Sequence, residues 1–384
     1  MDVDPSTLRC IISEGNIRRN SRWRFFELIH AAHRVIYKTG NLIIQGTYFK
    51  MAVAILYPGS MGGALARSIA NCSPSITLLT SLAGRSEASR DRALKAGLTD
   101  VSIEDLVVKS RVIISVLPPS SAETLAQEIK AIYDALDPGQ REPPIYIDAN
   151  AISPSTAFRI SKLLASSSIP FIDGSIIGGP PRDGYDPRLY LSAEAQYDSA
   201  VVGEVVEMLG GGGKHKNGRG LEFIVLKDAG VGAASALKMS YAGVTKGTVA
   251  LLTTMILSAH AHSPQTSQAL LVELAHSLPE MLKWGLWMAD HMVPSAYRWV
   301  GEMGEIADFI SNPTGAHPVG GASTSTGPIS VADTYRGIAC TFQRIADDLE
   351  QKAAPETSGN EDGNGRDVDI LKAWIQDGRN LTAP

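Results

Sequence analysis

Short β-rich runs alternate with helical segments between Met51 and Leu226, and this alternation constrains the fold more than any other feature. The predicted strands are Ala52–Leu56, Ser75–Thr80, Arg111–Val116, Pro144–Asp148, Pro170–Asp173 and Leu221–Leu226. The predicted helices between them are Met61–Asn71, Ser86–Ala96, Ser120–Leu136, Pro154–Ser166 and Ala195–Leu209. Strands that alternate with helices form right-handed βαβ units. The sequence therefore predicts an α/β domain over residues 51–227, a doubly wound parallel sheet covered by helices on both faces.

The character of the chain changes after residue 227. The stretch GAASALKMSYAGVTKGTVALLTTMILSAHA is rich in Ala, Leu and Met and has no proline, which predicts one long buried helix. Further helices are expected at Ser267–Met292, Ser295–Ile310 and Ser330–Gln351. We expect an all-helical domain over residues 228–351, built on the long helix. The polar residues 352–384 are expected to be a mobile tail that includes a short helix at Val368–Gln376.

The first 50 residues differ in charge from the rest. They hold eight Lys and Arg against four Asp and Glu, a net charge of +4 in a chain whose total is −5. Three interpretations stay open: a targeting peptide, a small helical extension that packs on the body, and an extension upstream of a natural start at Met51. Three Gly- and Pro-rich stretches, at 137–144, 210–220 and 311–328, are predicted to be loops.

Composition narrows the function classes. With 384 residues, 44% of them hydrophobic and 20% charged, the sequence is typical of a globular protein of two domains. The net negative charge argues against nucleic acid or an anionic membrane as the main partner, and we expect a small-molecule substrate. Three scattered cysteines indicate neither disulfides nor a zinc site and fit a reducing compartment. We expect a cytoplasmic location over a mitochondrial one, because four acidic residues in the first 50 are many for a transit peptide. His260 and His262 fall on different helix faces, so no metal is expected.

The stretch ILYPGSMGGALA, residues 55–66, follows a predicted strand and opens a helix. A dinucleotide-binding loop uses three glycines, for a tight turn, for backbone approach to the pyrophosphate and for close helix packing. Gly59 and Gly62 are spaced for the second and third tasks, and the amides of Ser60 and Met61 would face the phosphates. Tyr57 stands at the first glycine, so we expect it to be extended, because positive φ is costly for a bulky residue.

The end of the second predicted strand bears on the choice of cofactor. An acidic residue there usually holds the ribose of a cofactor without a 2′-phosphate. This chain has Ser81 instead, followed by Arg85, Ser86 and Arg90. A guanidinium beside hydroxyls suits a 2′-phosphate, which favours NADP over NAD. The alternative is an ordinary solvated helix start with Ser86 as the cap.

Three segments follow later strands: SVLPPSS, DANAISP and FIDGSIIGGPP; a fourth, GVGAASALK, brings Lys238. Together with LYPGSMG, they resemble the β-hydroxyacid dehydrogenase family and its relative 6-phosphogluconate dehydrogenase. Within that superfamily the sequence is similar to a fungal and bacterial branch whose C-terminal helical domain has no assigned function. The resemblance implies a Rossmann-type domain followed by a helical domain, and an oxidoreductase that acts as a homodimer.

The resemblance also implies roles for individual residues. Lys238 would exchange a proton with the substrate oxygen during hydride transfer. The family's asparagine after this lysine is missing, and Tyr241, one turn on, could supply a hydroxyl or the proton in its place. Lys246 is interpreted as a surface residue.

The binding residues that the resemblance implies fall into two groups. Ser175, Gly178 and Gly179 would meet a carboxylate or another polar group of the substrate. Asn150 would lie near the nicotinamide, and Leu117 and Pro118 would line the cofactor ribose.

The function that follows is an NADP-dependent oxidoreductase acting on a small hydroxy or keto substrate, with a lysine acid/base. Two alternatives stay open: an imine or ketone reductase that uses Tyr241 and Lys238, and a non-catalytic NADP-binding redox sensor.

Overall fold

The computed structural model describes residues 52–136, 143–182, 185–197, 200–210, 221–313, 330–353 and 366–382, with two short strands before them. The chain divides into two units, residues 1–50 and 51–384. In the first, the described part is the antiparallel pair β1 (Ile43–Ile44) and β2 (Thr47–Tyr48). The interpretations of the basic leader, and most of the three predicted loops, fall on residues outside the described ranges.

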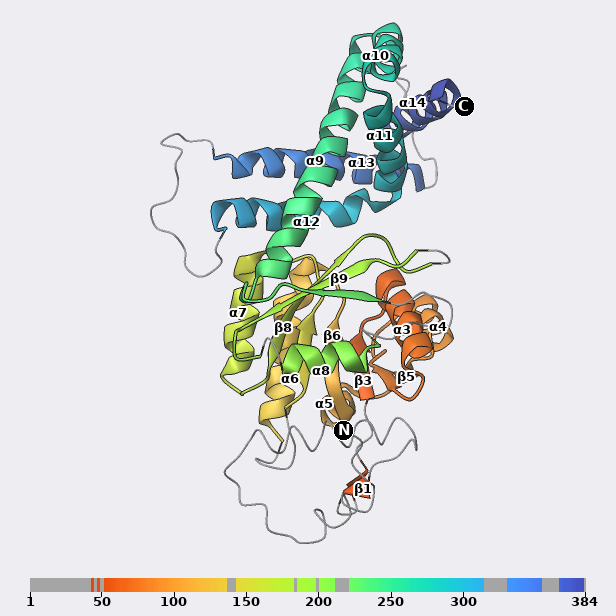
Figure 1. Ribbon diagram of the computed structural model, residues 1–384. Helices are drawn as coiled ribbons and strands as arrows, with labels where there is room; N and C mark the ends of the chain where they lie inside the picture. The colour runs from red at the N-terminus through yellow and green to blue at the C-terminus, as the bar shows by residue number, and fades with distance from the viewer. Residues whose placement is uncertain are drawn as a thin grey trace, which may run out of the picture. The chain divides into compact units, whose positions relative to one another are not determined.

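An eight-stranded sheet in the order β10-β9-β8-β7-β6-β3-β4-β5 forms the centre of the α/β part (Figure 1). Its strands are β3 (Ala52–Leu56), β4 (Thr77–Thr80), β5 (Thr99–Asp100), β6 (Ser110–Ser115), β7 (Ile145–Asp148), β8 (Phe171–Ile177), β9 (Arg188–Ala193) and β10 (Glu222–Val225). All neighbours pair in parallel except β8 and β9. The predicted doubly wound, mainly parallel sheet is confirmed.

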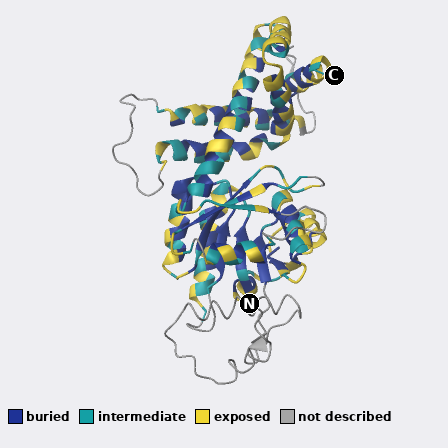
Figure 2. Ribbon diagram, in the orientation of Figure 1, coloured by how far each residue is buried: buried dark blue, intermediate teal, exposed yellow. Residues whose placement is uncertain are grey.

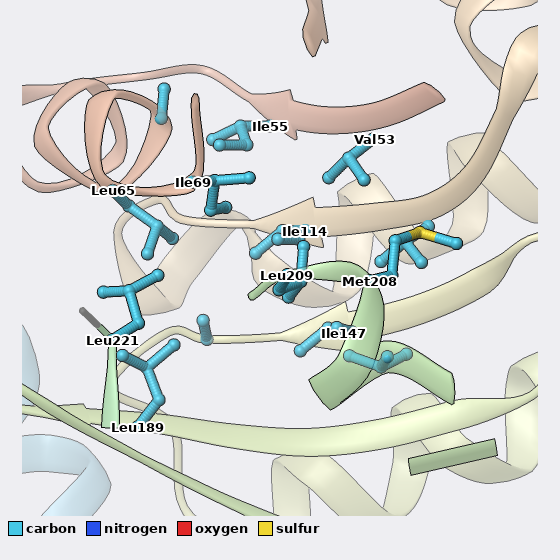
Figure 3. Packing of buried hydrophobic residues seen from close by; sticks show 14 of the residues in the cluster. Val53, Ile55, Leu65, Ile69, Ile114, Ile147, Leu189, Met208, Leu209 and Leu221 are labelled. Atoms are coloured by element: carbon cyan, nitrogen blue, oxygen red, sulfur yellow. The ribbon is translucent and has the colours of Figure 1, made fainter. Parts of the chain in front are cut away.

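Helices cover both faces of this sheet. They are α3 (Ser60–Cys72), α4 (Glu87–Lys95), α5 (Ile103–Lys109), α6 (Ala122–Asp134), α7 (Pro154–Ala165) and α8 (Val201–Met208), with a 3-10 turn η1 (Pro119–Ser121) before α6. Apolar side chains of α3, α4 and α8 pack on one face, in the cluster drawn in Figure 3. Those of α5, α6 and α7 pack on the other. Strands buried on both sides explain the nearly continuous apolar runs of β3 and β6.

The sequence pattern missed α5, β5 and β9. The first two are short, and β9 follows β8 after only the ten residues 178–187. A parallel neighbour needs a crossover of a dozen residues or more, so this short connection requires the antiparallel pairing that is observed.

The helical part consists of α9 (Ala233–His262), α10 (Pro264–Ser277), α11 (Pro279–Met292), η2 (Val293–Ser295), α12 (Ala296–Ser311), α13 (Ala332–Ala353) and α14 (Asp367–Thr382). Helix α9 is long and apolar enough to cross a membrane by length and composition. In this fold it packs against β8 and against α10 to α14, and its inward side chains join the core of the helical part (Figure 2).

Two expectations for the helical part were wrong. The single helix expected at Ser267–Met292 is broken at Leu278, because Pro279 cannot continue the preceding helix and begins α11. Within the tail that was expected to be mobile, the helix expected at Val368–Gln376 is present but longer, and it forms the amphipathic helix α14. Its apolar side chains Val368, Leu371, Trp374 and Ile375 are buried against the other helices.

Candidate active site

A row of polar side chains crosses four adjacent strands at the level where β6 and β7 end. Ser115, Asp148, Asp173 and Ser192 are register partners from one strand to the next, so they share one face of the sheet. All four are fully buried. Buried polar groups must be hydrogen-bonded to be tolerated, and the partners of this row belong to the two segments that carry Asn150 and Lys238.

Asp173 fastens the N-terminus of α9 to the sheet. One carboxylate oxygen accepts the Ser235 hydroxyl at 2.6 Å, and the other accepts the Ser235 amide at 3.0 Å and the Ser192 hydroxyl at 3.1 Å. The Ala234 amide donates to Ser192 Oγ at 3.1 Å. First-turn amides of a helix lack partners within the helix and carry a partial positive charge. The polar row supplies those partners and fixes where α9 begins.

Lys238 lies one turn farther along α9. Its Nζ donates to the backbone oxygen of Asn150 at 3.3 Å, which holds the ammonium over the end of β7. Burial lowers the pKa of Lys238 to about 8, and the neighbouring Lys246 acts in the same direction. Glu302, Asp148 and Asp173 oppose this shift. A lysine with a pKa near neutrality can both give and take a proton, as a general acid/base must.

The Asn150 side chain is fully engaged within the protein. Its amide group donates to Ser115 Oγ at 2.8 Å and to Asp148 Oδ2 at 2.9 Å, and its oxygen accepts the Leu117 amide at 2.6 Å. It therefore ties the end of β6 to the end of β7 and leaves its backbone oxygen for Lys238. Pro118 follows in the same loop, as the residue that caps the 3-10 turn η1.

Two buried carboxyl groups lie beneath the lysine. Burial raises the pKa of Asp148 to about 7, and the Asp173 carboxylate beside it adds to that effect, while the Asn150 amides oppose it. Burial also raises the pKa of Asp173, against the hydrogen bonds from Ser235 and Ser192. Perturbed titratable groups that gather at one strand end are typical of functional sites.

Lys246 is not the surface residue that the sequence analysis expected. It lies two turns beyond Lys238 on the same side of α9 and forms an ion pair with Glu302 of α12, with both side chains largely buried. Its ammonium also lies 4.8 Å from the centre of the Trp299 ring, a cation–π contact. Glu302 thus stands between two lysines and bears electrostatically on both.

Tyr241, the second residue implied in catalysis, is more than half exposed, and its hydroxyl forms no hydrogen bond with the part of the chain that the structure describes. The described chain therefore brings Lys238 to the strand ends and leaves the Tyr241 ring facing outward.

The implied substrate residues Ser175, Gly178 and Gly179 lie at the end of β8. Ser175 is buried, and its hydroxyl has no hydrogen-bond partner in the structure, which suits a group that meets a ligand. Gly178 has a φ of +123°, and a Cβ there would collide with the Tyr185 hydroxyl. The Gly179 amide already donates to that hydroxyl at 3.2 Å. Tyr185 thus shapes this loop, and Ser175 keeps the free polar group.

The loop from β3 to α3 has the features that a pyrophosphate requires. No side chain caps α3 and its first turn has no acidic residue, so the amides of Ser60 and Met61 are available to an anion. A Cβ at Gly59 would meet nothing within 4 Å, so the backbone there is open to close approach. At Gly62 a Cβ would press on Ile55 and Pro58 at 3.4 Å, which is the packing role of the third glycine. These residues fit a dinucleotide cofactor.

The conformation expected for Tyr57 was wrong. Its φ is +55°, the left-handed region that a glycine enters without cost, so the tight turn is kept although the glycine is not. For a bulky L-residue this conformation costs about 1–2 kcal/mol. The Tyr57 ring is half-buried and lies against the Arg85 guanidinium, whose carbon is 4.9 Å from the ring centre.

The end of β4 contributes the other residues expected for NADP. Ser81 is buried at the strand end, and Ser86 precedes α4, where its hydroxyl contacts Ser89 at 3.1 Å. Arg90 donates to the Arg85 backbone oxygen at 3.2 Å. The structure brings Arg85 to the cofactor loop, whereas Ser86 and Arg90 are engaged within their own helix start.

Comparison with known proteins bears on the domains around this site. Residues 52–194 match the family model of the NAD binding domain of 6-phosphogluconate dehydrogenase, so the α/β part is similar to a domain of that type. Residues 261–345 match a domain of unknown function, DUF1932. The two matches confirm the resemblance that the sequence motifs indicated. No curated protein sequence matches the chain.

Solved structures with the same fold include a conserved protein of unknown function described as similar to 3-hydroxyacid dehydrogenases. It is 24% identical, and the match covers 79% of this chain and all of that one, with a TM-score of 0.51. Another is 3-hydroxyisobutyrate dehydrogenase from Salmonella typhimurium, with 14% identity, 84% and 99% coverage and a TM-score of 0.53. A conserved hypothetical protein from Sinorhizobium meliloti is 16% identical, with 85% and 96% coverage and a TM-score of 0.53. These likenesses show the fold.

Several residues around the NAD-binding domain were not singled out from the sequence. Asp148 and Asp173 each occur in an Ile-Asp pair at the end of a predicted strand, and that repetition is a signal. Glu302, Glu305 and Asp308 recur every three residues along α12, which places them on one side of the helix. Glu305 accepts the Ser153 amide and Asp308 its hydroxyl, both at 2.6 Å, so α12 binds the start of α7.

Proposed function

We propose that the protein is an NADP-dependent oxidoreductase of the β-hydroxyacid dehydrogenase type. It interconverts a small hydroxy substrate and the corresponding keto compound, with Lys238 as the acid/base. The observation that carries this proposal is the position of Lys238. Its ammonium is bonded to the Asn150 backbone at 3.3 Å, above a row of buried polar groups at the strand ends, with a pKa of about 8.

The residues of the chain divide the work as follows. Gly59, Ser60 and Met61 hold the pyrophosphate, Gly62 lets α3 pack closely beneath it, and Arg85 with Ser81 holds the adenosine end. Bound NADP(H) supplies hydride transfer at this site. Lys238 donates a proton to the carbonyl oxygen in reduction and removes it from the hydroxyl in oxidation. Ser175, with its unpartnered hydroxyl, binds a polar group of the substrate.

The test is NADPH oxidation measured against a panel of keto acids, ketones and cyclic imines. We compare the wild type with Lys238→Met and with Lys95→Met, an exposed lysine on α4. Loss of a general acid lowers the rate by about 10²- to 10⁴-fold, and Lys95→Met keeps the wild-type rate. Equal low rates in the wild type and Lys238→Met would contradict an enzyme and favour the cofactor-binding sensor.

The imines in the panel address the reductase alternative. Tyr241 lies one turn after Lys238 and is more than half exposed, so its hydroxyl is open to a reacting atom. An imine preference that Tyr241→Phe abolishes would support this reductase. Keto-acid turnover that Tyr241→Phe leaves unchanged supports the dehydrogenase.

We also propose that the protein acts as a homodimer, as the family resemblance implies. Support comes from an apolar stripe along α9, formed by Tyr241, Val244, Leu251 and Met255, each more than half exposed. Sedimentation velocity tests it. Leu251→Glu is expected to yield monomer, whereas Leu94→Glu, at an exposed leucine of α4, leaves a dimer. A monomeric wild type would contradict this proposal.

A further inference from the structure

Tyr57 keeps a strained backbone in the middle of the cofactor loop. Its φ of +55° is the conformation that glycine adopts freely, yet the chain has one of its bulkiest side chains there. Strain of this kind persists where the surrounding structure over-determines it, and it gathers at ligand sites. A glycine would make the same turn without strain, so we looked to the contacts of the tyrosine ring for the reason that tyrosine is present.

The Tyr57 ring contacts Arg85, which follows the end of β4. The Arg85 guanidinium carbon lies 4.9 Å from the centre of the Tyr57 ring, within cation–π distance. Burial and the nearby Glu128 carboxylate raise the pKa of the Tyr57 phenol, so the ring is neutral at physiological pH. This one side-chain contact joins the cofactor loop to the turn after β4, although α3 and β4 separate the two segments in the sequence.

The backbone of Arg85 is held from its own side as well. Its amide donates to the Leu82 oxygen at 3.1 Å, and its oxygen accepts from Arg90 at 3.2 Å. The Leu82 amide in turn donates to Asp100 at 2.8 Å. The Arg85 backbone is thus held in this turn, and its exposed guanidinium is directed to the Tyr57 ring.

Arg85 forms no ion pair with a carboxylate in the part of the chain that the structure describes. Asp100, which lies beside this turn, accepts the Leu82 amide and lies 3.7 Å from Arg90. A preorganised guanidinium fork without a carboxylate is a receptor for a phosphate group. The contact with the Tyr57 ring uses the face of an exposed guanidinium, and the N–H groups of such a group lie along its edge, where a phosphate can bind.

We propose that Tyr57 is a specificity-positioning residue, whose ring presents Arg85 to the 2′-phosphate of the cofactor. This inference rests on the cofactor loop of the proposed function, and it names the feature that selects NADP over NAD. Tyrosine at the first glycine position strains the turn, and in return its ring helps the site to discriminate NADP from NAD.

The test uses adenosine 2′,5′-bisphosphate and 5′-AMP as probes, with dissociation constants from calorimetry. We expect the wild type to prefer the bisphosphate by at least tenfold. Tyr57→Gly, which relaxes the turn and removes the ring, lowers that preference about three- to tenfold, whereas Tyr57→Phe keeps it. Arg85→Ala abolishes the preference, and Tyr57→Gly has no further effect in that background. Arg92→Ala, at an exposed arginine of α4, is the matched control and changes nothing.

Three results would overturn the inference. The wild type could show no preference for the bisphosphate; Tyr57→Gly could keep the full preference; or Tyr57→Gly could weaken both probes equally. Thermal melts of each variant verify that it is folded. These outcomes can be distinguished from a failure of the proposed function. If turnover depends on Lys238 but uses NADH, the protein is still an oxidoreductase, and only the proposed role of Tyr57 is contradicted.

Discussion

The charge on Lys238 is set by the groups around one nitrogen atom. Burial favours the neutral amine, and the Lys246 ammonium repels a second charge, while Glu302, Asp148 and Asp173 favour the charged form. The balance leaves a pKa of about 8, far below the usual value for lysine. The charged Lys238 therefore lowers the free energy of unfolding by an amount that depends on pH.

This cost predicts how Lys238→Met changes stability. Lys238 has a pKa of about 8 when folded and 10.5 when unfolded, so between these values the unfolded state binds more protons. The destabilisation is complete below pH 8 and is relieved as the pH rises towards 10.5. Lys238→Met should raise the free energy of unfolding by up to about 3 kcal/mol at pH 7 and about 1 kcal/mol at pH 9.5. Urea titrations at both pH values measure it, and an equal gain at both would contradict the depressed pKa.

Removing the Glu302 charge should move the pH dependence of the reaction. Glu302 raises the pKa of Lys238, so Glu302→Gln lowers it and also frees the Lys246 charge. Carbonyl reduction needs the protonated lysine, and its rate falls as the pH passes through this pKa. We expect the alkaline limb of kcat/KM to shift down by about 0.5–1 unit. Glu350→Gln, on an exposed part of α13, serves as the control. An unchanged limb would exclude Glu302 from the electrostatics of the site.

The sequence predicted these residues unevenly. Lys238 follows a Gly-rich approach that a motif can capture, but the pairing of Lys246 with Glu302 joins α9 to a helix more than 50 residues away. Periodicity along α9 alone cannot reveal that contact. The prediction of an extended Tyr57 failed for another reason. Bulky residues ordinarily avoid positive φ, but the tight turn of this loop requires it.

At the scale of elements, the placement of α9 depends on hydrogen bonds to the polar row. Ser235 contributes both its amide and its hydroxyl to Asp173, which is fully buried. Ser235→Ala removes the 2.6 Å bond and leaves a buried carboxylate oxygen without it, at a cost of about 1–3 kcal/mol. Ser240→Ala, an exposed serine of the same helix bonded to its own backbone, provides the comparison in urea unfolding. Equal losses in the two variants would show that Asp173 does not anchor the helix.

Element boundaries were predicted well where turns and caps mark them. Strand β3 has the bounds that its apolar run indicates, and α7 begins at Pro154 as expected, with Ser153 as its cap. Strand β9 lacked such a signal, because its place in the sheet depends on the length of the preceding connection and on pairing with β8. Pairing of this kind is a tertiary property.

At the scale of the whole molecule, the last helix completes the core of the helical part. Helix α14 packs on α10 and α11, and the Trp374 indole nitrogen donates to the Ser267 backbone oxygen at 3.2 Å. Its polar composition suggested a mobile tail, but its apolar residues recur at helical spacing and fill one face. Helix α14 thus completes the core of the helical part, although its composition alone does not indicate a buried helix.

Trp374→Ala should therefore destabilise the helical part strongly. Trp374 is 4% exposed, and truncation of a buried tryptophan costs about 3–5 kcal/mol through lost burial and the cavity left behind. Trp287→Ala is the matched control, because Trp287 lies on neighbouring α11 but is 51% exposed. Thermal unfolding followed by circular dichroism should show a large drop in Tm for Trp374→Ala and a small one for Trp287→Ala. A Trp374→Ala variant as stable as the control would mean that α14 adds little to the core, and the tail would then be the dispensable segment that its composition suggested.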